Sequence, residues 1–222
     1  MAATIMTHLI KSVDIKENQI LRYAGITGEE IPENVTELIK KCLPDYERSV
    51  DYKACFLEVP VHIENETVSF DCFEIVSHNL STLLRGCDKA ILVAATLGVK
   101  TDMLIKRAEV TSKAEALILN SIAIAGIEQY MAVLNGYFKN LYNGYELRPR
   151  YSPGYGDVAL EYQKVLLDTL DTKRKIGVAL SDSLLMTPQK SVSAIIGLGK
   201  EGCIHLDRDC ELCNKKDCEY RL

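Results

Sequence analysis

The sequence predicts an α+β fold: a single domain in which helices, one of them long and central, pack on a mostly antiparallel sheet, followed by a short cysteine-rich C-terminal tail. Two observations predict this class. Helical and strand-like segments are mixed along the chain, without the regular alternation that builds a doubly wound parallel sheet. In addition, no internal repeat or low-complexity linker interrupts the chain before Gly199. We therefore expect one domain over residues 1–199 and a tail over residues 200–222.

Helices are predicted where apolar residues recur three and four positions apart. A first helix is expected to end near Tyr23, and a second carries one apolar stripe from Val35 to Leu43 and ends at Pro44. The longest helical spacing covers residues 101–135 and is apolar around most of its circumference, which indicates a central buried helix. Shorter helices are expected over residues 77–84 and from about 158 to 170.

Strands are predicted by alternation and by short apolar runs. Residues 52–63 place alternate apolar side chains on one face, which fits a half-buried strand. Residues 90–98 form a continuous apolar run that is too short for most helices and therefore indicates a strand buried on both faces. Further strands are expected over residues 67–70, 73–76, 176–180 and 190–197.

Composition and charge exclude several classes of protein. Hydrophobic residues make up 47% of the chain, which is typical of a globular protein. A formal net charge of −5 argues against a general nucleic-acid-binding protein, because neutralising phosphates requires clustered lysine and arginine. We identify neither a signal peptide nor a run of eighteen apolar residues. We expect a cytoplasmic protein that binds neither nucleic acid nor membrane.

The loop from Arg148 to Asp157 is the first candidate site. Its two prolines and two glycines exclude a regular helix or a central strand. Since a helix is predicted to follow, the loop would offer free backbone amides to an anion, and Arg148 and Arg150 would add donors suited to a carboxylate or phosphate. The same residues also fit a simple turn with two solvated arginines, and spacing alone does not decide between the two.

The eight cysteines fall into two groups. Four are dispersed among apolar residues, and we expect them to be reduced core residues: Cys42, Cys55, Cys72 and Cys87. Four are clustered in the tail with a C-x2-C core: Cys203, Cys210, Cys213 and Cys218. This spacing predicts metal binding, as a [4Fe-4S] cluster or as zinc, with a reduced or disulfide-bonded tail as the alternative.

Four blocks in a fixed order resemble the activation (reactivation) domain of cobalamin (vitamin B12)-dependent methionine synthase. They are Arg150–Tyr155, Ile176–Ser183, Met186–Pro188 and Lys190–Ser193. Residues 21–23 and 96–98 are similar to free-standing members of that family, and the resemblance spans about residues 14–199. The homocysteine, folate and cobalamin modules of the large synthase have no counterpart here, so we expect a separate activation subunit.

The resemblance implies a role in methionine biosynthesis. The domain would bind S-adenosylmethionine and dock onto a corrinoid-binding methyltransferase, such as a methionine synthase subunit, that carries the cobalamin. There, inactive cob(II)alamin is reduced by one electron, from a flavodoxin or ferredoxin, and trapped by methyl transfer from S-adenosylmethionine. Because the cobalt is the nucleophile, no catalytic residue is expected in this chain, which would supply orientation and electrostatics.

The resemblance also implies site residues. Arg150 would hold the methionyl carboxylate, and backbone groups around Ser152, Gly154 and Tyr155 would hold the rest of the ligand. Tyr155 could instead pack the loop, and Arg148 could be a surface charge. Glu128 is the one candidate for an acidic ligand contact, with a solvent-facing role as the alternative.

The sequence departs from the family pattern at two places, and the second departure, a missing aromatic pair, is the main support for an alternative function. Asp182 stands where the family commonly has glutamate, and the aromatic pair that follows the last strands of full-length synthases has no counterpart. One alternative is a non-catalytic partner of a corrinoid protein that keeps the fold without the ligand. The other is an iron–sulfur electron carrier to a corrinoid protein, which would be brown.

Overall fold

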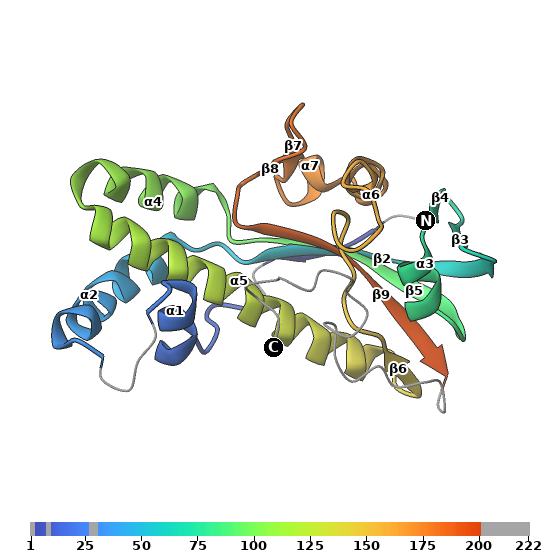
Figure 1. Cartoon of the computed structure of the whole chain (residues 1–222), viewed down its shortest axis with the longest axis horizontal. Coiled ribbons are helices and arrows are strands. Elements are labelled where there is room, and N and C mark those ends of the chain that lie inside the picture. The colour runs from blue at the N-terminus through green and yellow to red at the C-terminus, as the bar shows by residue number, and fades with distance from the viewer. Residues whose placement is uncertain (1–2, 8–9, 27–30, 201–222) are drawn as a thin grey trace.

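An antiparallel sheet forms the centre of the molecule in the computed structural model, which describes residues 3–7, 10–26 and 31–200 (Figure 1). Its strand order is β4-β3-β2-β5-β9-β6. Strand β1 pairs with the first part of β2, on the same edge of β2 that pairs with β3 further along. The strands of this sheet are β1 (Thr4–Thr7), β2 (Lys53–Glu64), β3 (Thr67–Phe70), β4 (Phe73–Val76), β5 (Cys87–Thr96), β6 (Tyr145–Leu147) and β9 (Ser191–Lys200). Two short strands, β7 (Ala179–Leu180) and β8 (Met186–Thr187), pair separately. The predicted α+β class with a mostly antiparallel sheet is confirmed.

Three long strands, β2, β5 and β9, carry the core on both faces. Leu92 of β5 lies opposite Leu57 of β2 and Ile195 of β9. Residues 90–95 are completely buried, as expected for a strand covered on both sides. Alternate side chains of β5 therefore enter two separate apolar clusters, one on each face of the sheet.

Helices cover both faces. The core of one face is built with α1 (Glu17–Tyr23), α2 (Glu33–Ser49), α4 (Val99–Thr111) and α5 (Lys113–Leu141). The opposite face carries α3 (His78–Leu83), α6 (Tyr162–Leu170) and α7 (Thr172–Lys175) (Figure 1). The sheet thus separates the two helical layers.

The long helical stretch predicted over residues 101–135 is in fact two helices. Ser112 adopts an extended conformation, and its hydroxyl accepts a hydrogen bond from the backbone N–H of Glu115, so it ends α4 and caps α5. By length and composition α5 could cross a membrane, with a mean hydropathy of 1.5 over its most apolar window. However, 61% of that window is buried within the domain, where α5 acts as the central core helix.

Other boundaries also differ from the prediction. Helix α2 continues through Pro44 to Ser49; Pro44 is exposed, so water can bind the carbonyl that loses its helical donor. Helix α6 begins at Tyr162 rather than near residue 158, because turns occupy the preceding residues. Strands β1 and β6, of four and three residues, were not predicted.

Three of the four dispersed cysteines are core residues, as predicted. Cys42, Cys55 and Cys87 are buried, whereas Cys72 is exposed in the turn between β3 and β4. The expectation of a core position is therefore wrong for Cys72, which lies at a hairpin tip outside both apolar clusters. The four cysteines of the tail lie outside the described residues.

Candidate functional site

The predicted loop begins as an extension of the sheet along the edge of β9. The backbone N–H of Arg148 donates to the carbonyl of Gly197 at 2.8 Å. Tyr151 and Ile195 then exchange two backbone hydrogen bonds of 2.9 and 2.8 Å. Beyond this bridge Pro153, which has no N–H, cannot continue the ladder, and the chain turns away from β9.

The turn is held by local hydrogen bonds and a left-handed glycine. Gly154 has φ +90°, a conformation that favours glycine, and its N–H donates to the carbonyl of Val158 at 2.9 Å. The Tyr155 N–H donates to the carbonyl of Ser152 at 3.2 Å, while the Tyr151 hydroxyl donates to the carbonyl of Tyr155 at 3.1 Å. These hydrogen bonds consequently give the loop a defined backbone conformation.

The helix N-terminus beside this loop is not the one predicted. Turns separate the loop from α6, and the loop instead meets the N-terminus of α3 through Asp157. This carboxylate accepts hydrogen bonds from the Ser77 hydroxyl and from the backbone N–H groups of His78, at 2.7 Å, and Asn79, at 3.3 Å. Partial burial raises the pKa of Asp157, but these hydrogen bonds outweigh it and the pKa is lowered. The helix N-terminus that lies beside the loop is therefore already bound by a carboxylate of the protein itself.

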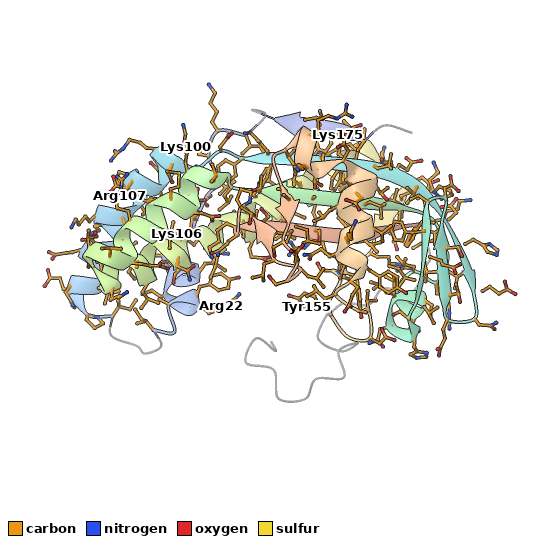
Figure 2. All side chains as sticks on the ribbon, turned by 90° about the horizontal axis from the view of Figure 1, so that it is seen from above. Arg22, Lys100, Lys106, Arg107, Tyr155 and Lys175 are labelled. Atoms are coloured by element: carbon orange, nitrogen blue, oxygen red, sulfur yellow. The ribbon has the colours of Figure 1, made fainter. Side chains whose placement is uncertain are left out.

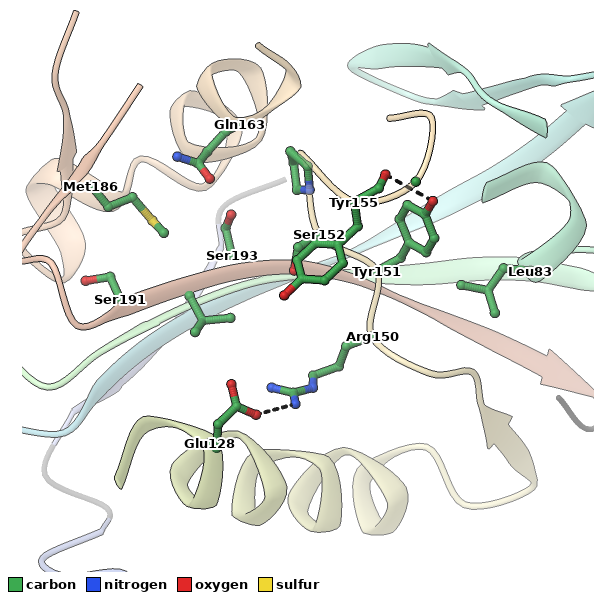
Figure 3. A pocket seen from close by; sticks show the side chains of 13 residues that line it. Leu83, Glu128, Arg150, Tyr151, Ser152, Tyr155, Gln163, Met186, Ser191 and Ser193 are labelled. Atoms are coloured by element: carbon green, nitrogen blue, oxygen red, sulfur yellow. Dashed lines mark hydrogen bonds and ion pairs between the residues drawn. The ribbon is translucent and has the colours of Figure 1, made fainter. Parts of the chain in front are cut away.

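A cavity of about 380 Å³ opens where the loop and β9 separate (Figure 3). Its size is within the range of about 300–1,000 Å³ common for small-molecule sites. It is lined by Leu83, Glu128, Arg150, Tyr151, Ser152, Pro153, Tyr155, Gly156, Gln163, Met186, Ser191, Val192 and Ser193. Three of the predicted site residues, Arg150, Ser152 and Tyr155, line it, whereas Gly154 shapes the loop behind them. Asp182 is exposed near the β7–β8 hairpin, outside this cavity.

An ion pair lies on the α5 side of the cavity. Arg150 Nη2 donates to Glu128 Oε2 at 2.8 Å, with the two side chains 28% and 41% exposed (Figure 3). Glu128 thus lines the cavity, and its side chain is at the same time partly exposed to solvent. Because neither charge is fully buried, a ligand can reach both without breaking into the core.

Arg148 and Arg150 have different environments. Arg148 is only 5% exposed, and its Nη2 donates to the backbone carbonyl of Arg85 at 3.3 Å. It is therefore a buried structural residue, and the alternative of a surface charge is wrong. Only Arg150 of the two lines the cavity.

The sheet and α6 add cavity residues that were not predicted as site residues. Gln163 is 6% exposed, and its Nε2 donates to the Leu184 carbonyl at 3.0 Å. One sequence signal could have identified it: Gln163 shares the buried face of α6 with Leu166, Leu167 and Leu170, where a polar side chain is unexpected. Tyr155 is 66% exposed and lies at the molecular surface (Figure 2).

The fold and the cavity define an α+β domain that is built on an antiparallel sheet and has a cavity beside β9. Residues 134–203, which contain the loop, α6 and β9, match the family model described as "Vitamin B12 dependent methionine synthase, activation domain". The chain is also similar to the solved structure "Crystal Structure of the MetH Reactivation Domain bound to AdoHcy", with a TM-score of 0.66 and 13% identity, covering 92% of this chain and 81% of that one. A comparison with curated protein sequences finds no match. The predicted resemblance to the activation domain of cobalamin-dependent methionine synthase is thereby confirmed.

Proposed function

We propose that this chain binds S-adenosylmethionine in the cavity beside β9 and supports reductive methylation of cob(II)alamin on a corrinoid-binding methyltransferase. The observation that carries the proposal is the Arg150–Glu128 pair at the cavity wall. Arg150 belongs to the segment that matches the activation-domain family.

The pair is complementary to the amino-acid end of S-adenosylmethionine. That end is a zwitterion, so its carboxylate can bind the Arg150 guanidinium while its ammonium group donates to the Glu128 carboxylate. In this structure the two side chains neutralise each other. The similar solved domain is described as bound to AdoHcy, which carries the same amino-acid end, and this supports the assignment.

The loop would hold the rest of the ligand through its backbone. Ser152, Gly154 and Tyr155 already have fixed positions in the turn, so binding does not require the loop to fold first. No residue of the cavity would need to act as a nucleophile or base, because the cobalamin of the partner would supply the nucleophile for the methyl group. The chain's contribution is to bind and orient the sulfonium ligand.

The partner and the setting follow from this chemistry. The cobalamin is carried by a corrinoid-binding subunit such as methionine synthase, which must reach the mouth of the cavity near the exposed Tyr155. A flavodoxin or ferredoxin would provide the electron, and all components would be cytoplasmic.

The test is calorimetric titration of the intact protein with S-adenosylmethionine. Arg150→Ala is expected to weaken binding about 10- to 100-fold, the loss of a hydrogen bond to a charged group. Arg174→Ala is the matched control, because Arg174 pairs with Asp171 on the surface and is 81% exposed. Failure of the intact protein to bind S-adenosylmethionine would overturn the proposal.

For the tail we infer a metal site formed by Cys203, Cys210, Cys213 and Cys218, holding a [4Fe-4S] cluster or zinc. Within the described part of the chain, no group of three or more metal-ligating side chains is present. The tail would begin after β9, whose last residue, Lys200, still pairs with Tyr145. Metal analysis after anaerobic purification distinguishes iron, with a brown colour, from colourless zinc, and absence of both contradicts the inference.

A further inference from the structure

The edge of β9 is open at one residue inside the cavity. The backbone N–H and C=O of Ile195 both bind Tyr151, on the edge of β9 that faces away from β5. Because backbone groups two residues apart on a strand point in the same direction, the N–H and C=O of Ser193 point to this edge as well. The residue that would pair with Ser193 by continuing this register is Pro153, which has no N–H to donate. Both residues line the cavity. The ladder therefore ends where the cavity begins.

The side chain of Ser193 is also without a partner. Ser193 is 2% exposed, and its Oγ has no hydrogen-bond partner among the described residues. Ser191, two positions earlier on the same face of β9, differs: its Oγ lies 2.8 Å from Thr96 Oγ1 and 2.7 Å from the Pro188 carbonyl oxygen. Because a buried hydroxyl is most stable with a hydrogen-bond partner, Ser193 offers a donor and acceptor that a bound ligand can use.

Ser193 and the ion pair lie on opposite sides of β9. Figure 3 shows Glu128 and Arg150 on the α5 side of the strand, and Ser193 on the side of Gln163 and α6. Glu128 and Arg150 are the only charged residues among those that line the cavity. A ligand bound to this pair by a zwitterionic end would therefore reach Ser193 with an uncharged end.

We propose that Ser193 determines specificity for a purine nucleoside at this uncharged end of the cavity, an inference that rests on the proposed function. A purine has flat apolar faces, which suit contact with the Met186 side chain and the Tyr155 ring. Its edge carries adjacent donor and acceptor atoms, which match the outward N–H and C=O of one strand residue and the hydroxyl of Ser193.

The experiment compares two ligands. S-adenosylhomocysteine carries both ends, whereas 5′-methylthioadenosine keeps the nucleoside and lacks the amino-acid end. Ser193→Ala is expected to weaken both about 3- to 10-fold, the value of one neutral hydrogen bond. Arg150→Ala is expected to weaken S-adenosylhomocysteine alone. Ser121→Ala is the affinity control, because this buried serine donates to the Leu117 carbonyl on α5, outside the cavity.

Thermal unfolding separates a ligand contact from a structural role. Without ligand, Ser193→Ala is expected to keep or raise the Tm, since its hydroxyl has no hydrogen bond to lose. Ser191→Ala is expected to lower the Tm, because it removes a satisfied hydroxyl. A lowered Tm for unliganded Ser193→Ala contradicts the inference.

The outcomes separate this inference from the proposed function. If the intact protein binds S-adenosylhomocysteine and Ser193→Ala binds it equally well, the Ser193 assignment is wrong while the proposed function stands. If the intact protein binds S-adenosylhomocysteine but not methylthioadenosine, or if Ser193→Ala weakens only the former, the nucleoside assignment is wrong. If the intact protein binds neither ligand, the proposed function itself is contradicted.

Discussion

At the scale of single residues, the site depends on which polar side chains already have hydrogen-bond or ion-pair partners within the protein. Arg148 lies against Gly197, where a β-carbon would come within 2.9 Å of the arginine Cγ, so the glycine makes room for a buried guanidinium. Arg150 pairs with a residue that a ligand can reach. Ser193 has a hydroxyl that the described residues leave unpaired. The difference between structural and binding residues here is a difference in burial and partners.

Asp157 gives a prediction at this scale. Its carboxylate ties the loop to the N-terminus of α3, so Asp157→Ala is expected to destabilise the protein by about 1 kcal/mol, as for other helix caps. Asp157→Asn removes the charge but keeps the shape. Because the folded-state pKa of Asp157 is lowered, its contribution is complete above the ordinary value of 3.8 and is lost as the pH falls below it.

Thermal unfolding of the wild type and Asp157→Asn at pH 7 and near pH 3 tests this. The Tm difference between the two proteins should shrink at the lower pH. Asp182→Asn, a change at an exposed position near the β7–β8 hairpin, is the control and should show little difference at either pH. An equal difference for Asp157→Asn at both pH values contradicts a role for its charge.

At the scale of secondary structure, a helix or strand could be predicted where the residues that determine it are neighbours in the sequence. The alternation in β2 and the apolar run of β5 are local properties of the chain, and both strands were predicted within a few residues. The division between α4 and α5 depends on one serine in an extended conformation, which the helical spacing on either side conceals. Strand β6 has three half-buried residues and exists because β9 offers it an edge.

Two glycines of α5 give matched predictions. An ideal β-carbon on Gly126 would lie 2.0 Å from Tyr46 Oη of α2, whereas one on Gly136 has nothing within 4 Å. Gly126→Ala is therefore expected to destabilise the protein by about 1–3 kcal/mol through overpacking. Gly136→Ala should stabilise it by about 0.5–1 kcal/mol, because alanine is the better helix former.

Urea unfolding of the two variants tests this prediction under identical conditions. Opposite signs of the change in unfolding free energy are expected from the same substitution, made ten residues apart on one helix. Equal effects of the two substitutions would show that α2 does not pack closely on α5 at Gly126.

At the scale of the whole molecule, the cavity is assembled from segments far apart in sequence. Glu128 comes from α5, Gln163 from α6 and Ser193 from β9, and all three line one cavity beside β9, which lies between the two helical layers. The loop could be singled out from its prolines, glycines and arginines, since that signal is local. The ion pair of Arg150 with Glu128 could not be predicted, because no spacing rule relates two residues that lie 22 positions apart, one on a helix and the other on a loop.

The two-layer core also predicts how the thiols react. Cys42 and Cys55 lie in the clusters on opposite faces of the sheet, and burial raises their pKa to about 11 and about 12. Iodoacetamide at pH 8 should therefore modify exposed Cys72 rapidly, and modify buried Cys42 and Cys55 only on global unfolding. Peptide mass spectrometry at increasing urea reports each site separately, with Cys72→Ser as the control for its peptide.

Both buried thiols should become reactive over the same urea range if the two layers unfold together. The raised pKa values also fix the sign of the pH dependence: their contribution to stability is complete below the ordinary thiol pKa of 9.0 and is lost as the pH rises above it, because only the unfolded chain ionises readily. Unfolding midpoints at pH 7.5 and 10 should therefore differ, with the lower midpoint at pH 10. Modification of Cys55 well before Cys42 would show that the layer containing α6 opens independently, and with it the side of the cavity that carries Ser193.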